Sequence, residues 1–153
     1  IDSSGIVREE KLSDVFQGVK KTSLKRNEIL RSVFVSSNSS KKIKSGYIKV
    51  GRRLSMECAI VSIAYHFQLA EDNAITRAGL SLGAVAPVIK FTEEACNYLI
   101  GKNAELITTE EVTRFAFLVK KYASPISDLR ASAWYRSEVL FNSTVAIFGN
   151  YEH

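Results

Sequence analysis

The chain has 153 residues, of which 46% are hydrophobic, and a formal net charge of +5. This length supports one ordinary hydrophobic core and argues against two full domains. The sequence contains no run of about 18 apolar residues, which excludes a transmembrane helix.

The positive charge is concentrated in the first third of the chain. Residues 1–53 contain 13 Lys and Arg against 5 Asp and Glu, a net +8, whereas residues 54–153 contain 8 against 11, a net −3. Such a basic segment attracts anions, whether phosphate groups, an acidic protein surface or a nucleic acid. A solvated basic face without a ligand is the alternative interpretation.

The segment before residue 41 is too small to fold alone. It holds a short amphipathic unit at Leu12–Phe16 and an apolar run at Ile29–Val35, for which we predict a strand. The Ser-rich stretch at residues 36–40 favours local side-chain to backbone hydrogen bonds and predicts an exposed linker. We therefore divide the chain into residues 1–40 and a main domain at residues 41–153.

Two alternating runs predict an antiparallel hairpin. Between residues 59 and 69 every second side chain is apolar or aromatic, and a second alternation follows at residues 78–84, after turn residues at 71–73. Gly79 and Gly83 lie on the other face of the second strand, which leaves that face bare. Bare faces of this kind indicate close approach by a helix or another subunit.

Helical patterns follow the hairpin. Thr92 supplies a capping hydroxyl before a helix at residues 95–100, and Gly101 suits the left-handed position after its end. Thr108 and Glu111 fit a capping box at the start of a second helix.

A third helix is predicted after Pro125, with Ser127 or Asp128 as its cap and an apolar stripe that begins at Leu129. Strands followed by helices indicate an α+β fold. We predict a small antiparallel sheet of about three strands, packed on one face by three helices.

The sequence offers few candidates for catalysis or metal binding. Cys58 and Cys96 lie in apolar segments without metal-type spacing, so we expect two buried thiols and a reducing compartment. His66 and His153 have no Cys or His at ligand spacing, and no Gly-rich phosphate loop or nucleophile elbow is present. We predict no metal site and no catalytic residue in this chain.

One polar cluster remains, at Tyr47–Arg53. It places Lys49, Arg52 and Arg53 beside a tyrosine and a flexible glycine. The combination suits a phosphate group, a flavin or nicotinamide edge, or an acidic partner. A charged segment leading into the following strand explains the same spacing equally well.

Five motifs follow one another along the chain: SGYxKxxxR at 45–53, ExA at 57–59, LSLGAVAP at 80–87, AxxYLxG at 95–101, and PISDLRASAxYR at 125–136. Their order is similar to that in the C-terminal domain of the FAD-binding subunits of molybdenum hydroxylases, the xanthine dehydrogenase and carbon monoxide dehydrogenase family. The stretches at 5–8, 12–18 and 24–30 resemble the end of the preceding flavin-binding region. The resemblance therefore covers nearly the whole chain.

The resemblance implies a role in the flavin subunit of a larger enzyme. Lys49 and Arg53 match family positions near the flavin and are the main cofactor-binding candidates, with Tyr47 as a weaker third. We assign four residues near the start of the last helix to structure and interface instead, because capping and packing account for its paired charges: Asp128, Arg130, Tyr135 and Arg136.

The resemblance also implies cofactors and partners for the intact enzyme. Electrons would flow from a molybdenum centre through iron–sulfur clusters to FAD and then to an acceptor. The Gly-rich loops that hold FAD belong to amino-terminal subdomains whose sequence this chain lacks, so we expect the isolated chain to be inactive and not to bind FAD tightly. The expected partners are that FAD-binding region, the molybdenum subunit and the iron–sulfur subunit, in the cytoplasm.

Two other functions stay open. A small nucleic-acid-binding module would use the basic first third, but it would require aromatic residues among the basic ones, and only Tyr47 is available there. A free-standing dimerisation or scaffold domain without a flavin is the second alternative.

Overall fold

The computed structural model describes residues 1–35, 42–53 and 57–149. The chain divides into two compact units, Ile1–Ser39 and Ser40–His153. The predicted linker at residues 36–40 and His153 lie outside the described residues. Within the described ranges, no helix has the length and apolar composition needed to cross a membrane.

The first unit contains little regular structure. A single helical turn, α1 (Leu12–Val15), leads into β1 (Phe16–Gly18), which pairs antiparallel with β2 (Lys21–Thr22). Among residues 1–35 no side chain is buried. This unit therefore has no hydrophobic core of its own.

The prediction of a strand at Ile29–Val35 is wrong. The segment has no regular secondary structure, and most of its apolar side chains, Phe34 and Val35 above all, are exposed. Ile29 exchanges backbone hydrogen bonds with Ile1, but no neighbouring strand continues the ladder. Apolar content alone does not make a strand where no partner supplies hydrogen bonds.

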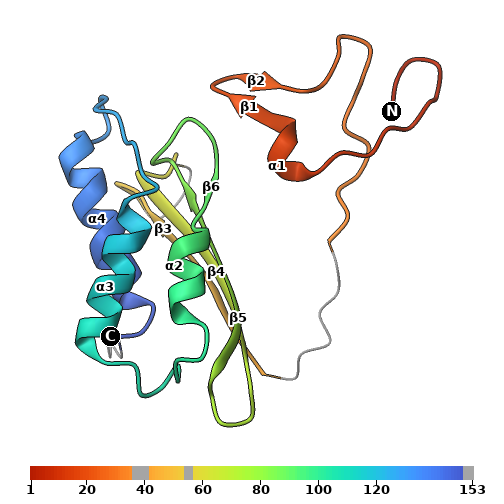
Figure 1. Ribbon diagram of the computed structural model, residues 1–153. Coiled ribbons are helices and arrows are strands. Elements are labelled where there is room, and N and C mark those ends of the chain that lie inside the picture. The colour runs from red at the N-terminus through yellow and green to blue at the C-terminus, as the bar shows by residue number, and fades with distance from the viewer. Residues whose placement is uncertain (36–41, 54–56, 150–153) are drawn as a thin grey trace. The chain divides into compact units, whose positions relative to one another are not determined.

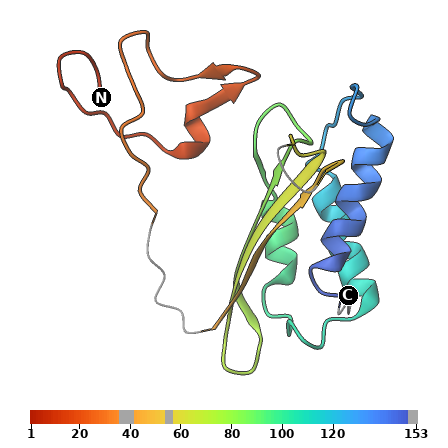
Figure 2. The same cartoon turned by 180° about the vertical axis from the view of Figure 1, so that it is seen from behind.

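The second unit has an α+β fold, as predicted (Figures 1 and 2). Its antiparallel sheet follows chain order: β3 (Ile43–Val50), β4 (Val61–Leu69), β5 (Ile75–Gly83) and β6 (Lys90–Phe91). Helices α2 (Glu93–Leu99), α3 (Thr109–Lys120) and α4 (Ala133–Ala146) cover one face of this sheet.

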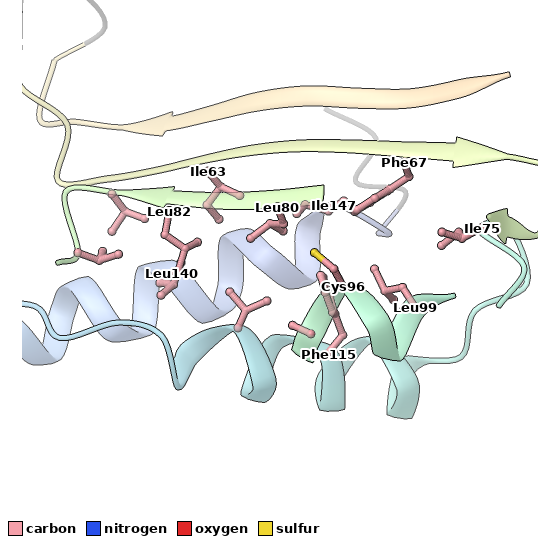
Figure 3. Close-up of a cluster of buried hydrophobic side chains, with 14 of the residues drawn as sticks. Ile63, Phe67, Ile75, Leu80, Leu82, Cys96, Leu99, Phe115, Leu140 and Ile147 are labelled. Atoms are coloured by element: carbon pink, nitrogen blue, oxygen red, sulfur yellow. The ribbon is translucent and has the colours of Figure 1, made fainter. Parts of the chain in front are cut away.

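The core lies between the sheet and its helices. Figure 3 shows Ile63, Leu80 and Leu82 of the central strands directed toward the helices. Leu99, Phe115 and Leu140, one from each helix, complete the cluster and are fully buried. Burial of each large side chain contributes roughly 1.5–3 kcal/mol, so this layer supplies most of the stability of the unit.

The helix caps agree with the sequence only in part. Thr108 and Glu111 form the predicted capping box of α3. Thr92 precedes α2 as expected, but its hydroxyl donates to the Leu80 carbonyl and caps nothing. Gly101 does adopt the left-handed conformation after α2, with φ +82°.

The last helix begins later than predicted. Its cap is Ser132, whose Oγ accepts a hydrogen bond from the Tyr135 amide, and not Ser127 or Asp128. Leu129, predicted to start the apolar stripe, lies outside the helix and is fully exposed. The Asp128 carboxylate instead accepts hydrogen bonds from the Arg130 and Ala131 amides. Aspartate, which is favourable as a helix cap, here stabilises the turn before the helix.

Candidate functional site

The sheet has a second face, which none of the helices described in this unit covers (Figures 1 and 2). On β3 the alternation places Ser45, Tyr47 and Lys49 on this open face, because Ile48 between them packs on the core. The two central strands contribute a floor of small and polar residues, namely Ser62, Ala64 and His66 from β4 and Gly79, Ser81 and Gly83 from β5.

Two exposed aromatic side chains border this floor. Tyr47 pairs with Ala64, Ala64 with Ser81, and Ser81 with Phe91, so one row of the sheet connects the two rings. Tyr47 is 66% exposed and Phe91 is 63% exposed. Three strand spacings separate them by about 14 Å, with only a methyl and a hydroxymethyl group between. The row forms a flat platform edged by aromatic rings.

Lys49 occupies the next row of the same face. It pairs with Ser62, and Ser62 pairs with Gly83. The absence of a side chain on Gly83 makes room for the Ser62 hydroxyl, whose Oγ lies 2.5 Å from where a Cβ on residue 83 would stand. Lys49 therefore presents a cation beside a hydroxyl and partly buried glycine backbone, about 7 Å along the strand from Tyr47.

The third candidate, Arg53, lies beyond the end of β3. Its Nε is 3.9 Å from Oε2 of Glu57, whereas Nε of the neighbouring Arg52 donates to Oε1 at 3.0 Å. The Glu57 side chain is only 5% exposed, and the hydrogen bond from Arg52 lowers the pKa of its carboxyl. One carboxylate thus holds two largely exposed guanidinium groups near the end of the strand.

The structure thus groups Tyr47 and Lys49 on one face and places Arg53 in the bend that follows. Sequence reasoning missed Phe91 and Glu57 as parts of this region. The glycine pattern had already indicated a bare face, but Phe91 belongs to a two-residue strand that is too short to show alternation. Glu57 pairs with arginines four and five residues away outside any helix, and no periodicity predicts such a pair.

Other candidate groups supply no chemistry among the described residues. No cluster of three or more His, Cys, Asp or Glu side chains could hold a metal there. Cys58 and Cys96 are both free thiols; Cys96 is buried, but Cys58 is exposed, contrary to the prediction. Burial raises the pKa of the Cys96 thiol, which makes it a poor nucleophile.

Comparison with known proteins places these features in context. Residues 46–150 match the family described as the CO dehydrogenase flavoprotein C-terminal domain. The chain is 28% identical over 133 residues to a xanthine dehydrogenase of Blastobotrys adeninivorans, a match that covers 86% of this chain and 10% of the relative.

Solved structures share the fold. Quinoline 2-oxidoreductase from Pseudomonas putida 86 superposes with a TM-score of 0.77 at 22% identity, covering 89% of this chain and 45% of that one. CO dehydrogenase from Oligotropha carboxidovorans superposes with a TM-score of 0.74 at 21% identity, covering 87% and 44%. The chain thus spans less than half the length of these proteins.

Proposed function

The chain belongs to the CO dehydrogenase flavoprotein C-terminal domain family, and we propose that it forms the C-terminal lobe of the FAD subunit of a molybdenum hydroxylase. In this proposal the lobe closes against the flavin with the open face of its sheet and is not catalytic alone. The family match over residues 46–150 is the observation that carries the proposal.

The open face fits a flavin. Its floor of Ala64, Ser81 and glycines is flat enough for a planar ring, and a Cβ on Gly79 would meet only the His66 carbonyl oxygen, at 3.8 Å. Tyr47 offers a ring for stacking, whereas Lys49 offers a cation for a carbonyl or phosphate oxygen. We assign Tyr47, Lys49 and, at the edge, Arg53 to FAD contact.

The chemistry comes from the cofactor and its partners. When bound in the intact subunit, FAD would take electrons from iron–sulfur clusters and deliver them to an acceptor. The residues of this chain would orient the ring, exclude water from one side and balance its charge. We infer that the molybdenum and iron–sulfur subunits are the partners and that the complex is cytoplasmic, where the two free thiols stay reduced.

The first unit supports the same assignment. Arg8 forms ion pairs with Glu10 and Glu28, and these charged residues line a pocket of about 280 Å³ together with apolar ones such as Leu12 and Phe34. A unit without buried side chains gains stability only by packing on further polypeptide. We therefore propose that residues 1–40 are the tail end of an FAD-binding region.

The comparisons do not favour the two alternatives. A nucleic-acid-binding module or a free scaffold would not account for a family match that covers most of the second unit. Beside the Tyr47 and Phe91 rings, the described cations of the open face, Lys49 of β3 and Arg77 of β5, lie in separate rows and form no continuous basic stripe. Strong binding to a polyanion requires several such cations.

Flavin uptake tests the proposal. The subunit that combines this chain with its FAD-binding region should purify with one bound FAD, and Lys49→Ala should raise the FAD dissociation constant about tenfold, the effect of losing one charge-assisted contact. Lys42→Ala is the matched control, because Lys42 precedes the same strand and donates to the Glu71 carbonyl.

The outcomes separate the parts of the proposal. A subunit that takes up no FAD would contradict the assigned function. Equal effects of Lys49→Ala and Lys42→Ala would remove Lys49 from the flavin contact and leave the family assignment intact. Tight, stoichiometric FAD binding by residues 1–153 alone would show that the FAD-binding region is dispensable.

A further inference from the structure

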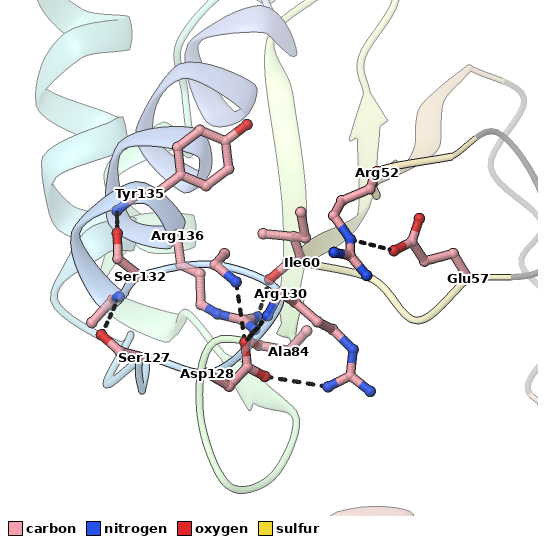
Figure 4. Close-up of polar contacts among 12 residues, drawn as sticks. Arg52, Glu57, Ile60, Ala84, Ser127, Asp128, Arg130, Ser132, Tyr135 and Arg136 are labelled. Atoms are coloured by element: carbon pink, nitrogen blue, oxygen red, sulfur yellow. Dashed lines mark hydrogen bonds and ion pairs between the residues drawn. The ribbon is translucent and has the colours of Figure 1, made fainter.

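Arg136 is a buried cation at the start of α4. Its side chain is 4% exposed, and it donates to the Ile60 carbonyl at 2.6 Å, the Ala84 carbonyl at 3.0 Å and the Asp128 carboxylate at 2.9 Å (Figure 4). Three segments that are far apart in sequence therefore meet at one guanidinium group. A planar fork holds three acceptors in one fixed geometry, whereas the three donors of a lysine ammonium rotate freely on a flexible stem.

Asp128 holds this guanidinium in place. Its carboxylate also accepts hydrogen bonds from the Arg130 and Ala131 amides and from the Arg130 side chain. The turn before α4 is thus built around the same oxygen atoms that bind Arg136. An ion pair with these additional bonds tolerates burial that an isolated charge would not.

Both carbonyl groups held by Arg136 lie next to the Lys49 row of the open face. Ile60 precedes β4, and its amide donates to the Val50 carbonyl at 2.7 Å, directly after Lys49. Ala84 follows Gly83, the last residue of that row. A continuous set of hydrogen bonds therefore runs from Asp128 through Arg136 and Ile60 to the end of β3.

The Arg136 guanidinium also stabilises the backbone turn at Ala84. Ala84 has φ +63°, a left-handed conformation that is uncommon for a residue with a Cβ. This conformation turns the chain out of the sheet immediately after Gly83. The bond from Arg136 to the Ala84 carbonyl holds the turn, and with it the end of β5.

Stability alone does not account for this arrangement. Nε of Arg136 is buried and has no hydrogen-bond partner among the described residues, which is a cost to folding. Buried ion pairs are often replaced by apolar side chains without loss of stability. A residue that served packing only would not need the fork.

We propose that Asp128 and Arg136 are positioning residues, which set the end of β3, β4 and β5 so that Lys49 meets the flavin. This inference rests on the function proposed above. It assigns to the PISDLRASAxYR motif a role in the geometry of the site, beyond the structural and interface roles expected from sequence.

The test measures FAD affinity in the intact flavin subunit. Arg136→Met removes the fork at similar length, and we expect the FAD dissociation constant to rise about tenfold, as much as the loss of the Lys49 contact itself. Val119→Ala is the control, because Val119 is fully buried in α3 but forms no part of this network. It should lower the melting temperature without changing FAD affinity.

A double-mutant cycle separates positioning from general destabilisation. If Arg136 acts through Lys49, Arg136→Met should change the FAD dissociation constant less than about threefold when Lys49→Ala is already present. The same tenfold change in both backgrounds would overturn the inference. An unchanged dissociation constant in Arg136→Met, together with a lowered melting temperature, would overturn it as well.

Milder variants cover the case in which Arg136→Met does not fold. Arg136→Lys keeps the charge but not the planar fork of donors. Asp128→Asn keeps an acceptor for the turn amides but removes the ion pair with Arg136. Each should raise the FAD dissociation constant by a smaller factor, and wild-type affinity in both would refute positioning. A wild-type subunit that binds no FAD would instead refute the proposed function, and the inference with it.

Discussion

The Tyr65 ring lies directly over Gly46 on the neighbouring strand. The two residues pair across β3 and β4, and a Cβ built on Gly46 would stand 2.5 Å from Tyr65 Oη and 2.7 Å from its Cζ. The ring is also stacked on Phe67, at 5.4 Å between ring centroids, which restricts its movement. Residue 46 must therefore have no side chain if Tyr65 is to keep its place.

Gly46→Ala should destabilise the second unit by about 1–3 kcal/mol, the usual cost of overpacking, measured by urea unfolding. Gly79→Ala is the control in the same sheet, because its Cβ would meet only the His66 carbonyl oxygen, at 3.8 Å. We expect that change to be neutral or stabilising by up to about 1 kcal/mol, since alanine suits a strand better. An effect of Gly46→Ala on stability no larger than that of Gly79→Ala would show that the Tyr65 ring moves aside at no cost.

Thr108→Ala should reduce stability by about 1 kcal/mol. The substitution removes the Oγ that accepts from the Glu111 amide and so opens the capping box of α3. Thr113→Ala is the comparison, because the Thr113 hydroxyl only donates back to the Thr109 carbonyl within the same helix. Chemical unfolding of both variants should show a clear loss at position 108 alone.

Stability should depend on pH through Asp128. The Arg130 amide and the Arg136 guanidinium hold the pKa of the Asp128 carboxyl well below its usual range. A lowered pKa in the folded state gives stability that is present above about pH 4, the unfolded value, and is lost as the pH falls below it.

Melting temperatures of the wild type and Asp128→Asn, measured from pH 7 to pH 3, check this expectation. The asparagine variant cannot titrate at this position, so the advantage of the wild type should be largest near neutral pH and should shrink in acid. A difference that stays constant over the whole range would exclude Asp128 as a source of the pH dependence.

Leu140→Ala should cost about 2–5 kcal/mol, because Leu140 is fully buried between α4 and the sheet. Leu106→Ala, at an exposed leucine, should stay within about 0.5 kcal/mol of the wild type. Guanidinium unfolding of the two variants compares them directly. Similar losses would mean that α4 does not cover the core.

The sequence predicts those parts of the fold that repeat a local pattern. The alternation in β4, the hairpin with β5 and the capping box of α3 all reflect contacts between residues close in the chain. β3 was missed as a strand because one of its faces is polar and it has a paired neighbour on one side only. Such an edge strand carries a weak hydrophobic signal.

The candidate site was predictable only as a segment. Tyr47 and Lys49 could be singled out from their composition and motif, but Phe91 joins them through three strand pairings. Arg136 contacts Ile60 across 76 residues. The spacing of neighbouring residues carries no information about a partner 76 residues away. From the sequence alone, a buried arginine therefore cannot be distinguished from an ordinary charged helix residue.

The distance along the chain between Ile60 and Arg136 also bears on biogenesis. Because strand order follows chain order, the meander can pair as it leaves the ribosome. Helix α2 packs on β5, but α4 is the helix that packs on β4, so the apolar side of β4, Ile63 included, stays only partly covered until α4 has been synthesised. Nascent chains that end before Ala133 would therefore be substrates for chaperones, and release from them would coincide with docking of the final helix.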